Sequence, residues 1–133
     1  MTRVLLDTGI LSDFINHRRG ISDRIRGLLE QGTRVGTCIP VLAEIVAGIE
    51  CGQSRERNMK ALLLGLPVLR LWPFDEAAAF QYGAIFADLR KKGRPMQSID
   101  IMVASVALRL GNCRVATTDS DLLAIEGLDV QIW

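Results

Sequence analysis

Two aspartates of this 133-residue chain follow short apolar stretches that have the pattern of buried strands. Asp7 comes directly after Val4-Leu5-Leu6, and Asp119 comes directly after residues 114–118. In open α/β sheets, binding and catalytic sites gather beyond the carboxyl ends of the strands. We therefore expect the two carboxylates to reach one shared crevice.

Three more acids are expected near the same crevice. Glu44 and Asp100 each lie in the first turns of a strongly apolar predicted helix, and Asp121 stands two residues past Asp119. Carboxylates this close repel one another unless cations neutralise them. Oxygen ligands without a nearby histidine or cysteine select Mg²⁺ or Mn²⁺. The pattern predicts a site for Mg²⁺, with Mn²⁺ as the alternative ion, and such a site suits phosphodiester hydrolysis.

Each acid taken alone also has a purely structural explanation. Asp7 is a good N-cap for the helix that follows it, and residues 118–121 resemble a capping box with Thr118 as the cap. Asp100 near a helix start complements the helix dipole, and Glu44 is explained as a surface glutamate. Because at least four carboxylates are directed to one end of one sheet, the shared site is favoured over these separate roles.

Other catalytic chemistries lack the residues that they need. His17 is the only histidine and lies in the polar stretch 16–20, which predicts a solvated loop residue. The cysteines, Cys38, Cys51 and Cys113, form no C-x-x-C pair. Neither a structural zinc site nor a Ser-His-Asp or Cys-His arrangement is therefore expected. An odd number of widely spaced thiols fits a reducing compartment.

Short apolar strands alternate with helical patterns along the chain. The strands are expected at residues 4–6, 34–37, 68–71, 114–118 and 129–132. The helices are expected after residues 7–9, at 21–32, 40–52, 54–64 and 75–93, from Ser98 onwards, and at 119–125. This alternation predicts an α/β fold with a parallel sheet covered by helices on both faces.

A single domain, residues 1–133, accounts for the length and for the 49% hydrophobic composition. The N-terminus has no signal-peptide pattern, since Asp7 interrupts it and no small-residue cleavage site follows. The longest apolar stretch, 61–69, contains Pro67 and is far shorter than the roughly 20 residues of a membrane span. We expect a cytoplasmic protein that has no membrane partner.

Four segments occur in an order and spacing that resemble the PIN-domain nucleases: VLLDT, PVLAEIVAGI, GRPMQSIDIMVASVALRLG and VATTDSDL. Within that family the chain looks most like the VapC-type toxins of bacterial toxin–antitoxin pairs, over essentially its full length. The resemblance implies a PIN-like three-layer sandwich in which a five-stranded parallel sheet lies between helices. It also implies an Mg²⁺- or Mn²⁺-dependent endoribonuclease that hydrolyses RNA phosphodiester bonds.

The resemblance also implies roles for single residues. The catalytic acids that it identifies are Asp7, Glu44, Asp100 and Asp119. Of these, it implies that Asp7, Asp100 and Asp119 bind the metal. Supporting positions are Thr8, Thr117 and Asp121, where the hydroxyl of Thr117 is expected to hold a carboxylate or a water.

Three positions depart from the family pattern. Gly9 stands where Asn is commonest, Gln97 where Gly is usual, and Leu122 where Phe is frequent. The first two differences concern substrate contacts or the bonds that orient the acids. Because none of the three removes an acid, activity is still expected.

The net charge of +1 conceals a basic excess outside the predicted site. Without the five acids of the crevice, 16 Lys and Arg face only 10 Asp and Glu. Metal binding would unmask this basic surface for phosphates. The candidate RNA contacts are Arg18, Arg19, Arg24, Arg26, Arg90 and Arg94. Solvated helix faces and helix-end charges are an equally good explanation for any one of them.

The family resemblance implies partners besides RNA. These are a second copy of the chain in a homodimer and a cognate VapB-type antitoxin, with promoter DNA bound only through the antitoxin. An alternative function is a catalytically weak PIN-like interaction module, whose acidic pocket binds an arginine of a partner. Apolar residues in 41–49 and 61–66 exceed what one buried stripe requires, so they are either interface or core.

Overall fold

The structure, a computed structural model, describes residues 2–133 and contains one five-stranded sheet in which every pair of neighbouring strands is parallel. The strands are β1 (Arg3–Leu6), β2 (Arg34–Cys38), β3 (Arg70–Trp72), β4 (Cys113–Thr117) and β5 (Asp129–Ile132). Their order in the sheet is β3-β2-β1-β4-β5. The chain therefore winds outward in both directions from β1, and the β1–β4 pair is the switch point where α/β sheets bind ligands.

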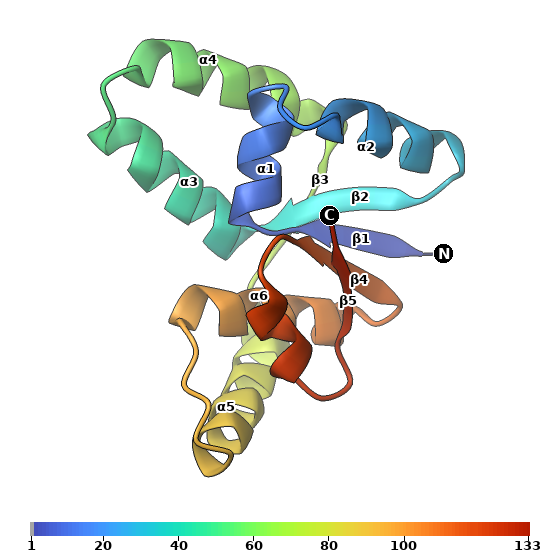
Figure 1. The fold of residues 1–133 in the computed structure, drawn as a ribbon, viewed down its shortest axis with the longest axis vertical. Coiled ribbons are helices and arrows are strands. Elements are labelled where there is room, and N and C mark those ends of the chain that lie inside the picture. Colours follow the sequence, from blue (N-terminus) through green and yellow to red (C-terminus); the bar gives the residue numbers. More distant parts are fainter. Residues whose placement is uncertain (1) are drawn as a thin grey trace.

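Helices cover the sheet from both sides, as expected (Figure 1). They are α1 (Thr8–Ile15), α2 (Ile21–Glu30), α3 (Ile39–Cys51), α4 (Arg55–Gly65), α5 (Glu76–Lys91) and α6 (Ser98–Leu110). In Figure 1, α1, α2 and α4 lie above the sheet and α5 and α6 lie below it. Helix α3 contacts α1 and α4 from the upper group and α6 from the lower. The predicted α/β three-layer sandwich is confirmed. None of the helices described for residues 2–133 has both the length and the apolar character to cross a bilayer.

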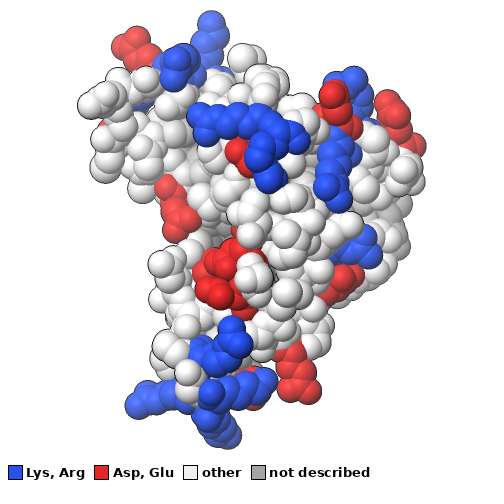
Figure 2. All heavy atoms as spheres, viewed as in Figure 1, with Lys and Arg blue, Asp and Glu red and all other residues white. Residues whose placement is uncertain are grey.

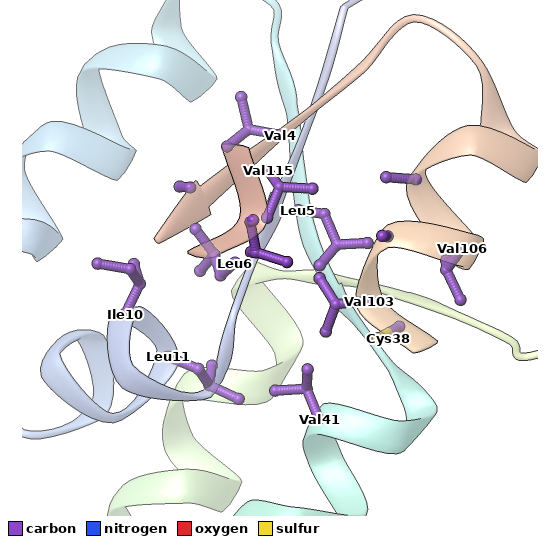
Figure 3. Packing of buried hydrophobic residues seen from close by; sticks show 14 of the residues in the cluster. Val4, Leu5, Leu6, Ile10, Leu11, Cys38, Val41, Val103, Val106 and Val115 are labelled. Atoms are coloured by element: carbon purple, nitrogen blue, oxygen red, sulfur yellow. The ribbon is translucent and has the colours of Figure 1, made fainter. Parts of the chain in front are cut away.

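The core surrounds β1 (Figure 3). Val4, Leu5 and Leu6 are all at most 2% exposed, because helices cover both faces of this strand. Around them pack side chains of α1, α3, α6 and β4, among them Leu11, Val41, Val103, Val106 and Val115. The last residue of β1, Leu6, pairs with Ala116 of β4, so Asp7 directly after it lies at the carboxyl edge of the sheet.

Most element boundaries differ from the expected ones by one or two residues, and the differences around β3 and β4 have a clear local cause. Strand β3 begins at Arg70 rather than at residue 68, because residues Leu66–Val68 form a 3₁₀ turn, η1, that continues from α4. Pro67 stabilises this turn through its restricted φ angle. Strand β4 ends one residue early, at Thr117, and the last helix is a short 3₁₀ helix, η2 (Ser120–Ala124).

Gly36 of β2 lets β3 approach closely. A Cβ atom at Gly36 would lie only 2.5 Å from the backbone oxygen of Arg70. We expect Gly36→Ala to lower the free energy of unfolding by about 1–3 kcal/mol, the usual cost of overpacking. The matched control is Gly48→Ala in α3, where a Cβ has nothing within 4 Å; there alanine should stabilise by about 0.5–1 kcal/mol. Urea denaturation measures both, and equal stability of Gly36→Ala and wild type would contradict the β2–β3 pairing.

Candidate functional site

The central strands bring two of the predicted acids to one edge of the sheet. Asp7 follows β1, and its backbone N–H donates to the carbonyl of Ala116 in β4 at 3.1 Å. Asp7 also caps α1, since its Oδ1 accepts from the backbone N–H of Ile10 at 2.9 Å. Asp119 comes two residues after the end of β4. The structural explanation of Asp7 as an N-cap is therefore correct, and the same residue lies beside β4 at the carboxyl edge of the sheet.

Thr117 connects these two acids. Its side chain is fully buried, and its hydroxyl donates a hydrogen bond to the Asp7 carboxylate. The same oxygen accepts from the backbone N–H of Asp119 at 2.9 Å. One hydroxyl therefore orients both the Asp7 carboxylate, which follows β1, and the backbone of Asp119, which follows β4.

A shallow cavity of about 410 Å³ contains three of the five predicted acids. Its lining residues are Pro95, Met96, Gln97, Asp100, Asp119 and Asp121. Asp100 stands in the first turn of α6, and Asp121 in the first turn of η2. Figure 2 shows acidic side chains gathered in a hollow near the middle of this face, with basic side chains above and below it.

Mutual repulsion and burial change how these acids ionise. The pKa of Asp100 is raised to about 6, first by burial and then by the charges of Asp119, Asp7, Glu44 and Asp121. The pKa of Asp7 is also raised, because burial outweighs the hydrogen bonds from Thr117 and Ile10. The other four predicted acids are therefore near enough to act on Asp100, and a cation among them would relieve this repulsion.

The donor atoms suit a hard divalent cation. Carboxylate and hydroxyl oxygens are the ligands that Mg²⁺ and Mn²⁺ prefer, and the site offers no histidine or cysteine. Among residues 2–133, no group of three acidic, histidine or cysteine side chains is already arranged to hold a metal. The type of ligand therefore fits such an ion, while the side chains as they stand do not form a complete coordination set.

The remaining predicted site residues vary in how closely they approach the cavity. Glu44 is exposed on α3 and adds to the raised pKa of Asp100 without lining the cavity. Thr8 is half-buried at the start of α1, next to Asp7.

The predicted capping box at residues 118–121 has a different N-cap residue from the expected one. Thr118 is exposed, and Asp119 is the N-cap of η2, since its Oδ1 accepts from the backbone N–H of Asp121 at 2.8 Å.

Three of the six candidate RNA-binding arginines are engaged within the chain. Arg19 donates to the backbone oxygen of Trp133 at 2.9 and 3.1 Å and pairs with Asp13. Arg24 lies 4.4 Å from the centroid of the Trp133 ring, and Arg26 pairs with Asp23 at 2.6 Å. The others, Arg18, Arg90 and Arg94, form no ion pair with any residue in the described range 2–133.

Residues outside the predicted acids also shape the site. Pro95 and Met96 line the acidic cavity, although their residue types predict no role in metal or phosphate binding. Gln97, noted only as a departure from the family pattern, is the N-cap residue of α6 and lines the cavity beside Asp100. The Gly-Arg-Pro stretch before Ser98 could have indicated these residues, since it predicts a loop at the mouth of the crevice.

His17 is exposed, with its Nδ1 3.3 Å from the hydroxyl of Ser22, as expected for a loop residue.

Comparison with known proteins gives consistent matches in sequence. Residues 4–128 match the PIN domain. The tRNA(fMet)-specific endonuclease VapC of Shigella flexneri is 30% identical over 133 residues, covering 100% of this chain and 99% of the relative. Ribonuclease VapC1 of Haemophilus influenzae strain R2866 is 30% identical over 131 residues, covering 97% of this chain and 96% of the relative.

Solved structures share the fold over the whole chain. VapBC2 from Rickettsia felis, bound to a DNA fragment from its promoter, superposes with a TM-score of 0.92 at 25% identity, covering 99% of each chain. DNA-bound VapBC from Salmonella typhimurium gives a TM-score of 0.89 at 27% identity, covering 100% of this chain and 99% of that one. With sequence and structural matches that span nearly every residue, the chain belongs to the PIN domain family, in its VapC branch.

Proposed function

We propose that this chain is a divalent-metal-dependent endoribonuclease and the toxin of a type II toxin–antitoxin pair. The observation that carries the proposal is that Asp100, Asp119 and Asp121 line one cavity, while Thr117 orients the Asp7 carboxylate beside β4. A site that holds like charges together without a counter-charge is suited to a cation. The ribonuclease names of relatives across the whole chain support this activity.

We assign a separate role in the reaction to each residue of the acidic site. Asp7, Asp100 and Asp119 would hold Mg²⁺, or Mn²⁺, which when bound supplies an activated water and neutralises charge on the phosphate. Glu44, exposed at the border of the site, would orient that water or accept its proton. Thr117 keeps the Asp7 carboxylate in place through its hydrogen bond. Asp121 supports Asp119 by donating its backbone N–H to that side chain.

Arginines that have no internal partner would hold the RNA backbone. Arg90 and Arg94 flank the end of α5, close to the Pro95 and Met96 wall of the acidic cavity. Arg18 lies in the turn between α1 and α2. Arg19, Arg24 and Arg26 are engaged with Trp133, Asp13 and Asp23, so we assign them mainly to the packing of the C-terminal strand and of α2.

An apolar groove provides a place for the antitoxin. It has a volume of about 430 Å³ and lies between α1, α2 and α4. Leu64 and Val68 line it and are 70% and 49% exposed, whereas residues Val41, Ile45 and Ile49 of α3 are core. Of the two explanations left open for these stretches, core applies to the buried residues of 41–49, and we propose the interface for the exposed residues of 61–66. The solved VapBC complexes, one bound to a fragment of its promoter and one to DNA, support a VapB-type partner for this chain. We further propose a cytoplasmic homodimer that reaches promoter DNA only through that partner.

The proposed activity has a direct test. Purified protein incubated with single-stranded and structured RNA should cleave in Mg²⁺ or Mn²⁺ and should not cleave in EDTA, because the acids need a cation to bind phosphate. Gel electrophoresis of the products measures the effect. An Asp100→Asn preparation, purified in parallel, controls for contaminating nuclease. Equal cleavage in EDTA would exclude the metal mechanism.

The same experiment separates ribonuclease from interaction module. If the protein cleaves no RNA in either metal but binds a partner through an arginine in the acidic cavity, the alternative function is supported. Both functions predict that a partner arginine blocks the cavity. Only the ribonuclease predicts that this arginine inhibits cleavage.

A further inference from the structure

A second hollow adjoins the acidic cavity on the side of α5. Its volume is about 300 Å³, and it lies between the end of α5, the loop that follows and the first turn of α6. Pro95 and Met96 line both hollows, and Ile101 in the second hollow directly follows Asp100 in the first. The two hollows are therefore neighbours that share the wall formed by Pro95 and Met96.

The second hollow is apolar except for one cation. Phe86 forms an exposed wall, 46% exposed, and the ring of Tyr82 stacks against it with 6.2 Å between centroids and 18° between planes. Leu89 and Ile101, each 2% exposed, form a buried apolar floor. Arg90 is the basic lining residue, and it has no ion pair within residues 2–133.

These features favour a ligand that joins a planar aromatic ring to a negatively charged group, as a nucleotide does. An aromatic wall favours stacking with any nucleobase, and an arginine beside it favours the attached phosphate. The volume stands at the lower end of the roughly 300–1,000 Å³ found for small-molecule sites, which suits one base rather than a large ligand. A second copy of the chain is the competing occupant of this hollow, and the tests below distinguish it from a nucleotide.

We propose that this hollow binds the base of the nucleotide next to the phosphate that is cleaved in the acidic cavity. The proposal rests on the proposed ribonuclease function and adds how the substrate is held. Phe86 stacks on the base, and Arg90 contacts its phosphate. Because any base can stack on an aromatic ring, we expect the site to bind an unpaired nucleotide of any sequence.

Nucleotide binding tests the proposal without any cleavage. The protein, labelled at its methionine methyl groups, is titrated by NMR in EDTA with AMP, CMP, GMP or UMP and with ribose 5-phosphate, which lacks a base. At least one nucleotide should shift the Met96 methyl signal, and ribose 5-phosphate should not. Phe86→Ala should weaken this binding by at least about fivefold, the lower end for loss of one stacked base.

Phe80→Ala is the matched control, because Phe80 is also an exposed phenylalanine of α5, at 75%, but does not line the hollow. It should bind nucleotides like wild type. Phe86→Leu, which keeps an apolar side chain and loses the ring, provides a second test should Phe86→Ala not fold. In RNA cleavage, Phe86→Ala should slow an intact substrate by at least about fivefold and leave a substrate with an abasic site at that nucleotide unchanged.

Several results would overturn the proposal. One is equal shifts of Met96 by ribose 5-phosphate and by the nucleotides, which would indicate phosphate binding alone. Another is the absence of any shift at the highest soluble nucleotide concentration, and a third is dissociation of a homodimer by Phe86→Ala without loss of nucleotide binding. Failure to cleave any RNA would refute the proposed function, whereas the titration in EDTA would still decide whether the hollow binds a base.

Discussion

Asp100→Asn is expected to lower metal-dependent RNA cleavage by more than about a hundredfold. Loss of residues that only orient metal ligands already costs about 10–100-fold, and Asp100 is a proposed ligand itself. The substitution keeps the size of the side chain and removes its charge. Single-turnover cleavage of one RNA by wild type and variant, at saturating Mg²⁺, measures the difference.

The same substitution should stabilise the metal-free protein. In the folded chain the Asp100 carboxyl has a pKa of about 6, against its ordinary value of 3.8. Between these values the folded state binds more protons than the unfolded state, so the free energy of unfolding falls as pH rises and the loss is complete above about pH 6. Because Asp100 is partly exposed and screened by solvent, this loss is on the order of 1 kcal/mol. Asp100→Asn should remove it.

Urea denaturation in EDTA at pH 4, 5, 6 and 7 tests this effect. Wild type should lose stability across the series relative to Asp100→Asn, and the two curves should converge at the acidic end. A variant that is inactive and also less stable at pH 7 would indicate a packing role for Asp100 instead of a functional one. Activity near that of wild type in a folded variant would show that the site assignment is wrong.

Asp7→Asn should be equally inactive but should stabilise less. The carboxylate of Asp7 accepts from both Thr117 and Ile10. Asparagine keeps one acceptor oxygen and caps a helix as well as aspartate does, but its amide group faces the Thr117 hydroxyl, which already accepts from Asp119. Relief of repulsion is therefore offset by a disturbed hydrogen bond, which the free energies of unfolding of the two variants would show.

The part of the fold that the sequence predicts well is the part that depends on local pattern. Val4-Leu5-Leu6 is a continuous apolar run, and such a run is stable only as a strand covered on both faces, as β1 is. The parallel sheet follows from the alternation of strands with helices. Asp7 and Asp119 meet because the carboxyl ends of parallel strands lie on one edge.

Long-range contacts explain what the sequence does not predict. The pairing of Arg19 and Arg24 with Trp133 joins residues more than a hundred positions apart, so no local pattern distinguishes these arginines from Arg18. The exposure of Phe86 is also not predicted by local pattern, because Phe86 has the helical spacing of the α5 core positions and is nevertheless 46% exposed. The hollow beside it forms only when the loop before α6 folds back, which periodicity does not encode.

Bacterial growth tests the toxin together with its antitoxin. Expression of this chain alone should arrest bacterial growth, and co-expression of the small gene adjacent in its operon should restore growth. Asp100→Asn should be harmless without rescue, because growth arrest requires cleavage. Growth curves after induction measure all three, and arrest by folded Asp100→Asn would favour the interaction-module function over the ribonuclease.

A substitution in the apolar groove between α1, α2 and α4 can test antitoxin binding separately from RNA cleavage. Leu64→Glu places a charge in the apolar groove, far from the acids, so the protein should still cleave RNA and arrest growth but escape rescue. Leu63→Glu is the matched control, since Leu63 is also exposed on α4, at 61%, but does not line the groove. Rescue of Leu64→Glu as complete as that of Leu63→Glu would place the antitoxin elsewhere, and co-purification of the partner with each variant would show the same difference by direct binding.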